Sequence, residues 1–164
     1  MKVLYYGGQK SGKSRLAEMK TLTLSGDKKP HYLATYNNSY CDAEMQRRID
    51  QHQQQRAEKF ISIEEPIEIE AFIEEGNTYL IDCVSMWILN TLEREIEELF
   101  ETIERLSHKD ANIVFVLNEV ASGVIPLDPE SRKFVDRSGI LGQKLATLSD
   151  EVYEVKLGLE RRLK

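Results

Sequence analysis

A glycine-rich stretch near the amino terminus has the residue types and the spacing of a phosphate-binding loop. Residues 7–14 match the pattern G-x-x-x-x-G-K-[ST] and stand between the apolar run 3–6 and a helix-like segment. In such a loop, backbone N–H groups and the positive end of the following helix converge on one anion. A chance glycine-rich turn is the alternative, but this context favours a site for a nucleoside triphosphate. The predicted contacts are Gly7, Gly8, Gln9, Lys10, Ser11, Gly12, Lys13 and Ser14.

Two residues of the loop and one distant acid carry its chemistry. Lys13 would reach the β- and γ-phosphates, and Ser14 would place its hydroxyl on Mg²⁺. Asp82 ends the apolar run 79–81, and in phosphate-loop proteins an acid at the end of such a strand usually faces Mg²⁺. Many strands end in aspartate, so only the pairing with the loop favours Ser14 and Asp82 as metal ligands. We interpret the adjacent Cys83 as a small buried residue and not as a reactive thiol.

A polar segment, residues 42–56, carries a histidine between two arginines. Glu44, Arg48, His52 and Arg56 follow one another at four-residue steps, so on a helix they would share one face. The flanking guanidinium groups disfavour the imidazolium, and a neutral imidazole is a nucleophile for which the arginines could orient a phosphate. The segment has few apolar positions, so the spacing alone fits a solvated helix face with an incidental histidine slightly better.

The elements that must position these residues alternate between strand and helix. We expect strands over 2–6, 31–34, 79–81, 112–117 and 152–157, and helices over 14–24, 42–58, 67–75 and 131–148. Apolar residues at intervals of three or four predict a further helix from an N-cap at Ser85 to Leu106. This alternation predicts an α/β fold, a mostly parallel sheet flanked by helices of the P-loop NTPase type, in a single domain over 1–164. In such sheets ligands bind beyond the carboxyl ends of the strands.

Composition narrows the classes of function. The chain has 164 residues and a net charge of −6, which suits one compact enzyme and disfavours non-specific attraction to nucleic acid. We expect no membrane span, because no stretch approaches the roughly 18 apolar residues that one needs. We expect no signal peptide either, because too few apolar residues precede Gly7. Cys41 and Cys83 show neither metal spacing nor a disulfide framework, so a reducing cytoplasm is the predicted location.

The whole pattern resembles the adenosylcobinamide kinase / adenosylcobinamide-phosphate guanylyltransferase family over nearly the entire chain. The resemblance depends on the phosphate loop, on Asp42-x-Glu44-Met45-x-x-Arg48-Ile49-x-x-His52-x-x-x-Arg56 and on Asn118-Glu119-Val120. The histidine segment is its specific part, because a phosphate loop alone fits dozens of families. Further matching blocks are 32–35, 81–83, Trp87, Asn90, 123–126, 134–136, Gly139, Gln143, 145–146 and 158–164.

The resemblance implies two reactions of late cobalamin assembly. In one, ATP or GTP phosphorylates the aminopropanol hydroxyl of adenosylcobinamide. In the other, the histidine that His52 matches attacks the α-phosphate of GTP, expels pyrophosphate and becomes a guanylyl-histidine. GMP then passes to adenosylcobinamide phosphate, giving adenosylcobinamide-GDP. The resemblance also implies a homotrimer.

Carried over residue by residue, the resemblance makes His52 and Lys13 catalytic. It places nucleotide contacts beyond the loop on Ala34, Thr35, Tyr36, Gln53, Gln54, Gln55, Arg56, Glu64 and Asp82. Glu64 suits a reader of guanine, because the N1–H and the 2-amino group are donors that face one carboxylate. The chain departs from the family pattern at Ala121, Gly142 and Phe60, where the family usually has Gly, Asn and Trp. We expect Ala121 and Gly142 to lie near the corrinoid.

Two other functions fit the sequence apart from the resemblance. One is a phosphate-loop kinase of another small molecule with His52 incidental. Such a kinase leaves no GMP on histidine. The other is a non-enzymatic, nucleotide-gated module that binds a partner protein. Such a module shows no turnover.

Overall fold

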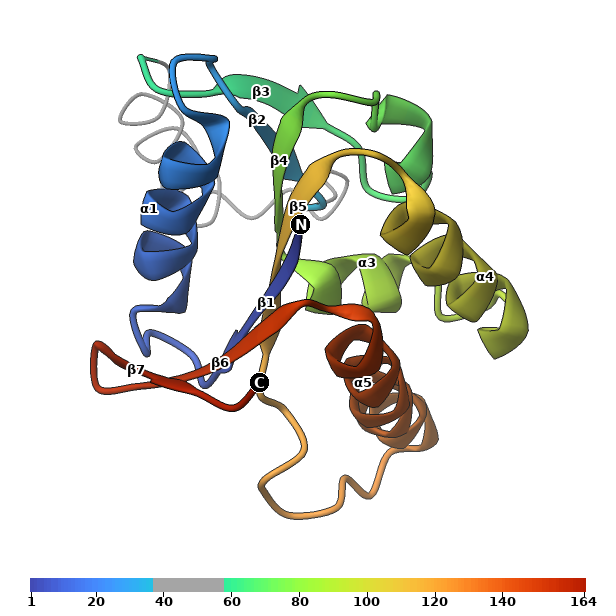
Figure 1. Ribbon diagram of the computed structural model, residues 1–164. Helices are drawn as coiled ribbons and strands as arrows, with labels where there is room; N and C mark the ends of the chain where they lie inside the picture. The colour runs from blue at the N-terminus through green and yellow to red at the C-terminus, as the bar shows by residue number, and fades with distance from the viewer. Residues whose placement is uncertain (37–57) are drawn as a thin grey trace.

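The computed structural model describes residues 1–36 and 58–164, which form a seven-stranded sheet with helices on both faces (Figure 1). The strand order is β3-β2-β4-β5-β1-β6-β7, and every neighbouring pair is parallel except β6 and β7. The strands are β1 (Lys2–Gly7), β2 (His31–Ala34), β3 (Ile61–Glu64), β4 (Thr78–Asp82), β5 (Asn112–Asn118), β6 (Glu151–Lys156) and β7 (Leu159–Arg162).

The helices divide unequally between the two faces of the sheet. α1 covers one face, whereas α3, α4 and α5 cover the other (Figure 1). Successive side chains of a strand point to opposite faces, so Val3 and Tyr5 pack with α1 while Leu4 packs with the α5 side. The described helices are α1 (Lys13–Ser25), the 3₁₀ helix η2 (Ile69–Phe72), α3 (Val84–Asn90), α4 (Ile96–His108) and α5 (Pro129–Leu148).

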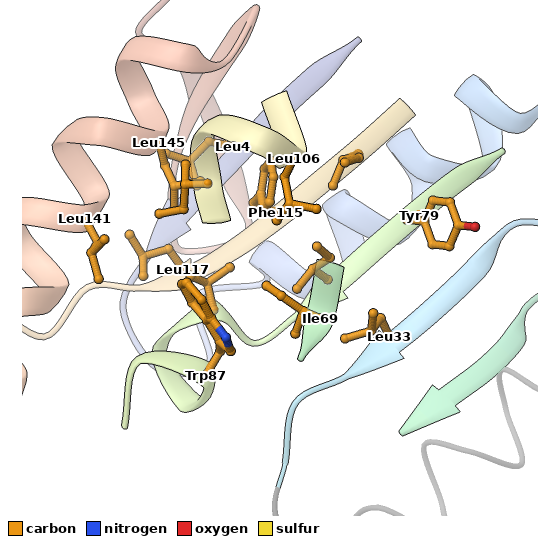
Figure 2. Close-up of a cluster of buried hydrophobic side chains, with 14 of the residues drawn as sticks. Leu4, Leu33, Ile69, Tyr79, Trp87, Leu106, Phe115, Leu117, Leu141 and Leu145 are labelled. Carbon is orange, nitrogen blue, oxygen red and sulfur yellow. The ribbon is translucent and has the colours of Figure 1, made fainter. Parts of the chain in front are cut away.

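The larger core lies on the face that α3, α4 and α5 cover. Figure 2 shows Leu141 and Leu145 on α5, with Leu4, Leu117 and Trp87 in the same cluster. Strands β1, β4 and β5 are buried on both faces, which explains their nearly continuous apolar sequences. β5 lies between β1 and β4, so one strand separates the phosphate loop from the acid that ends β4.

The predicted α/β fold is confirmed, and each of the five predicted strands is present. Two strands that the sequence did not predict, β3 and β7, occupy the two edges of the sheet. Both are four residues long and largely exposed, so they lack a strong hydrophobic pattern. The predicted helix 67–75 is only the four-residue η2. The predicted helix 42–58 lies almost wholly outside the described residues.

The single helix predicted from Ser85 to Leu106 is wrong, because the structure has two helices, α3 and α4. α3 ends at Asn90, whose side-chain amide donates to the backbone oxygens of Thr35 at 2.8 Å and Pro66 at 3.0 Å. These bonds hold the end of α3 against the segment that follows β2. The apolar spacing runs on through the turn between the helices, so periodicity alone could not reveal the break.

Ser85 is also not the N-cap that the sequence predicts. Cys83 holds that position, and Ser85 lies inside α3, where its Oγ accepts a hydrogen bond from the backbone N–H of Asn118 at 2.9 Å. α5 begins two residues before its predicted start, because Asp128 caps it by accepting from the N–H of Ser131 at 2.7 Å. Among the described residues, no helix combines the length and apolar character that crossing a membrane requires.

Candidate nucleotide-binding site

The phosphate loop connects the carboxyl end of β1 to the first turn of α1. Gly12 and Lys10 both adopt left-handed backbone angles, with φ of +97° and +57°. Glycine reaches such angles without strain, which explains the glycine at position 12. α1 begins at Lys13, so the N–H groups of its first turn have no partner within the helix. The loop therefore presents backbone donors and a helix amino terminus at the carboxyl edge of the sheet, the arrangement that binds phosphate.

The β6–β7 hairpin holds the loop in place. A Cβ at Gly7 would lie 2.4 Å from the backbone oxygen of Val155, so β1 and β6 meet here with no room for a side chain. The N–H of Gly158, at the tip of the hairpin, donates to the backbone oxygen of Ser11 at 2.8 Å. Leu157 (φ +53°) and Gly158 (φ +79°) are both left-handed, as a tight two-residue hairpin turn requires. The carboxyl-terminal hairpin is therefore a structural support of the phosphate loop.

Lys13 is a buried cation at the centre of the site. Its side chain is 6% exposed, and its Nζ donates to the backbone oxygen of Gly8 at 3.1 Å. Burial lowers the pKa of Lys13, while the neighbouring Cys83 and Asp82 act in the opposite direction. Asp82, which ends β4, is therefore close enough to the loop for its charge to act on Lys13. A desolvated ammonium is suited to an anionic ligand.

Asp82 is oriented by the strand beside it. The hydroxyl of Tyr32 in β2 donates to Oδ2 of Asp82 at 2.7 Å. Strand register places Glu64, Ala34 and Asp82 opposite one another at the carboxyl ends of β3, β2 and β4. The proposed guanine reader and the proposed metal ligand therefore lie on the same edge of the sheet as the phosphate loop.

Thr35, which the sequence places among the nucleotide contacts, is fully buried. Its hydroxyl donates to the backbone oxygen of Cys83 at 2.6 Å and accepts from the N–H of Cys83 at 3.0 Å. The side chain thus fastens the end of β2 to the end of β4. Any contact of Thr35 with a nucleotide would fall to its backbone, and its side chain positions the neighbouring Asp82.

Sequence reasoning missed Asn118 as a site residue. Asn118 ends β5 between Gly7 and the end of β4, and its Nδ2 donates to Sγ of Cys83 at 3.2 Å. Burial, followed by the charge of Asp82, raises the pKa of that thiol, and Cys83 as a whole is half-buried, so its unreactive role stays a prediction. Oδ1 of Asn118 is buried and has no hydrogen-bond partner among residues 1–36 and 58–164. The sequence did contain one signal for this role, because Asn118 is a polar residue that ends the continuous apolar run of β5.

Two side chains at the carboxyl edge offer the kind of oxygen donor that Mg²⁺ uses. Residues 1–36 and 58–164 contain no group of three or more His, Cys, Asp and Glu placed to hold a metal. Mg²⁺ usually takes one or two protein oxygens and completes its shell with phosphate oxygens and water. Ser14, in the first turn of α1, and Asp82 are oxygen donors of that kind.

The structure brings most of the predicted site residues to one edge of the sheet. Those at the carboxyl ends of the strands are Gly7, Gly8, Gln9, Lys10, Ser11, Gly12, Lys13, Ser14, Ala34, Thr35, Tyr36, Glu64 and Asp82. The remaining predicted residues, which lie outside the described part of the chain, are His52, Gln53, Gln54, Gln55 and Arg56.

Comparison with known proteins gives a full-length match. A family model described as cobinamide kinase / cobinamide phosphate guanyltransferase matches residues 3–163. The bifunctional adenosylcobalamin biosynthesis protein CobP of Pseudomonas aeruginosa is 35% identical, over 100% of this chain and 98% of that protein. The corresponding protein CobU of Escherichia coli is 30% identical, over 100% of both chains.

A solved structure supports the fold alone. It is an ATPase domain that superposes with a TM-score of 0.50 at 10% identity, covering 93% of this chain and 68% of that one.

Proposed function

This chain belongs to the cobinamide kinase / cobinamide phosphate guanyltransferase family, and we propose that it catalyses both reactions in that name. The observation that carries the proposal is a phosphate loop whose buried Lys13 lies beside Asp82, in a chain that matches the family from residue 3 to residue 163. The substrates would be ATP or GTP, adenosylcobinamide and adenosylcobinamide phosphate.

The kinase step is assigned to the carboxyl edge of the sheet. The hydroxyl oxygen of the aminopropanol arm attacks the γ-phosphorus, the bond to the β,γ-bridging oxygen breaks, and the hydroxyl proton passes to solvent. Lys13, which bonds the Gly8 carbonyl in the structure, would turn to the β- and γ-phosphate oxygens. Mg²⁺, when bound, would neutralise charge on those oxygens, and Ser14 and Asp82 are the residues that would hold it.

The guanylyl step is assigned to His52 through the family resemblance. A ring nitrogen attacks the α-phosphorus of GTP, the bond to pyrophosphate breaks, and the ring loses its proton. A phosphate oxygen of adenosylcobinamide phosphate then attacks the same phosphorus and releases the histidine. We assign recognition of guanine to Glu64, which ends β3 on the same edge as the loop, with Gln53, Gln54, Gln55 and Arg56 as further nucleotide contacts.

Product analysis tests this function directly. With GTP, Mg²⁺ and adenosylcobinamide, mass spectrometry should detect adenosylcobinamide phosphate first and adenosylcobinamide-GDP later. With ATP as the only nucleotide, the reaction should stop at the phosphate. A folded protein that binds GTP but phosphorylates no corrinoid would instead be a phosphate-loop kinase of another small molecule.

A further inference from the structure

A pocket of about 240 Å³ lies between α5 and the sheet, on the face opposite α1. Leu4 of β1 and Leu117 of β5 line it from the sheet side. α5 contributes small residues at four-residue steps, Ser138, Gly142 and Ala146, together with Gly139. A Cβ built at Gly139 meets no atom within 4 Å. A Cβ at Gly142 would lie 3.1 Å from Cδ2 of Leu117, so α5 packs closely on the sheet there and the open space lies beside Gly139.

Two of the residues that line the pocket carry a buried polar atom. Ser138 is 4% exposed, and its Oγ has no hydrogen-bond partner in the described structure. Oδ1 of Asn118, which also lines the pocket, is buried and equally without a partner. Burying an unpaired polar atom is costly, and such atoms in native proteins call for an explanation. An apolar pocket with a few convergent polar groups is the usual form of a small-molecule site.

The polar end of the pocket adjoins the nucleotide site. Asn118 stands opposite Gly7 in the register of β5 and β1, and the N–H of Glu119 donates to the backbone oxygen of Gly7 at 2.9 Å. On its other side Asn118 contacts Cys83, which follows Asp82. A ligand in the pocket would thus have one end beside the phosphate loop and the acid of β4.

We propose that this pocket binds the aminopropanol arm of cobinamide, with the hydroxyl of the arm at Asn118. The inference rests on the proposed function. The arm combines methylene and methyl groups, which suit Leu4 and Leu117, with an amide and a hydroxyl. The hydroxyl can donate to Oδ1 of Asn118, and the amide can pair with the hydroxyl of Ser138. The corrin ring is too large for the cavity and stays outside it.

The first test removes one polar contact. Ser138→Ala deletes an unpaired buried hydroxyl, so a purely structural role predicts unchanged or increased stability and an unchanged KM for adenosylcobinamide. The proposal predicts that this KM rises about tenfold, equivalent to about 1.4 kcal/mol of binding. The KM for GTP and the yield of GMP-labelled protein should stay the same. Thr147→Ala, which removes an exposed hydroxyl from the same helix, is the matched control and should change none of these values.

The second test fills the cavity. Gly139→Leu should place its side chain in the pocket and raise the KM for adenosylcobinamide by more than tenfold, while the smaller Gly139→Ala has a weaker effect. Normal GMP labelling shows that each variant is folded and binds GTP. If the wild-type protein phosphorylates cobinamide and both Ser138→Ala and Gly139→Leu keep its KM, the pocket assignment is wrong. If the wild-type protein does not phosphorylate cobinamide, the proposed function itself fails.

Discussion

The phosphate loop and the α5 pocket meet at Asn118, yet they use glycine in opposite ways. At Gly7 a Cβ would lie 2.4 Å from the backbone of β6, whereas at Gly139 a Cβ would meet nothing within 4 Å. On the nucleotide side glycine lets two backbones approach closely, and the loop that follows binds phosphate with backbone groups. On the α5 side glycine leaves volume for a ligand that side chains recognise. The first arrangement tolerates almost no substitution, while the second can be reshaped by ordinary changes of side chain.

Loss of the buried cation should give the largest effect. Lys13→Ala should reduce both the kinase and the guanylyl-transfer activities at least a hundredfold, because the preorganised charge on the phosphates is gone. The free energy of unfolding should not fall, since the change also removes a desolvated ammonium. Activity assays alongside urea unfolding measure both, with Lys133→Ala on the surface of α5 as the control. Normal GTP turnover by folded Lys13→Ala would remove the loop from the mechanism.

The two glycines should respond to the same substitution with opposite signs. Gly7→Ala should lower the free energy of unfolding by about 2 kcal/mol, because its Cβ collides with the backbone at Val155. Gly139→Ala should raise it by about 0.5–1 kcal/mol, because alanine is the better residue inside a helix. Urea unfolding of the two variants and of the wild-type protein measures both changes in the free energy of unfolding. If both variants changed the free energy of unfolding in the same direction, the contrast between close packing at Gly7 and open space at Gly139 would be wrong.

Two ion pairs, one on each face of the sheet, should differ in their contribution to stability by a smaller amount. Lys20 of α1 pairs with Glu151 of β6 at 2.6 Å, with side chains 23% and 12% exposed, and this bond lowers the pKa of Glu151. Because that pKa is lower in the folded state, the stabilisation is present above the ordinary carboxyl range and is lost as the pH falls through the lowered pKa of the folded state. Glu151→Gln should therefore cost about 1 kcal/mol at pH 7 and progressively less as the pH falls through that lowered pKa.

On the α5 face, the bond from Lys144 likewise lowers the pKa of Glu104, but that carboxylate is exposed. Glu104→Gln should change stability less than Glu151→Gln at pH 7. Unfolding midpoints measured from pH 3 to pH 7 test both variants together. A larger loss at Glu104 would reverse the comparison between the two faces.

What the sequence predicted well is local. The phosphate loop, Asp82 at the end of β4 and the central strands each carry their signal within a few residues, through glycine spacing or continuous apolar runs. The structure places these features at one edge of the sheet, as the fold class required.

What the sequence could not predict depends on contacts between distant segments. The side chain of Asn90, the last residue of α3, bonds to Thr35 and Pro66, and no local pattern records those partners. Ser138 and Gly139 look like ordinary helix residues until the sheet is packed against them. The expectation that Ala121 and Gly142 lie near the corrinoid stays a prediction, although both line the α5 pocket.

Under the proposed function, one chain both phosphorylates cobinamide and carries GMP on a histidine. The most direct measurement is incubation with α-labelled GTP and Mg²⁺, followed by denaturing mass analysis of the wild-type protein and of His52→Asn. We predict a GMP adduct on His52 that survives alkali and is lost in mild acid, because a phosphoramidate hydrolyses once its nitrogen is protonated. His52→Asn should lose the adduct yet still phosphorylate adenosylcobinamide. An undiminished adduct in His52→Asn, or an acid-stable one, would contradict this account.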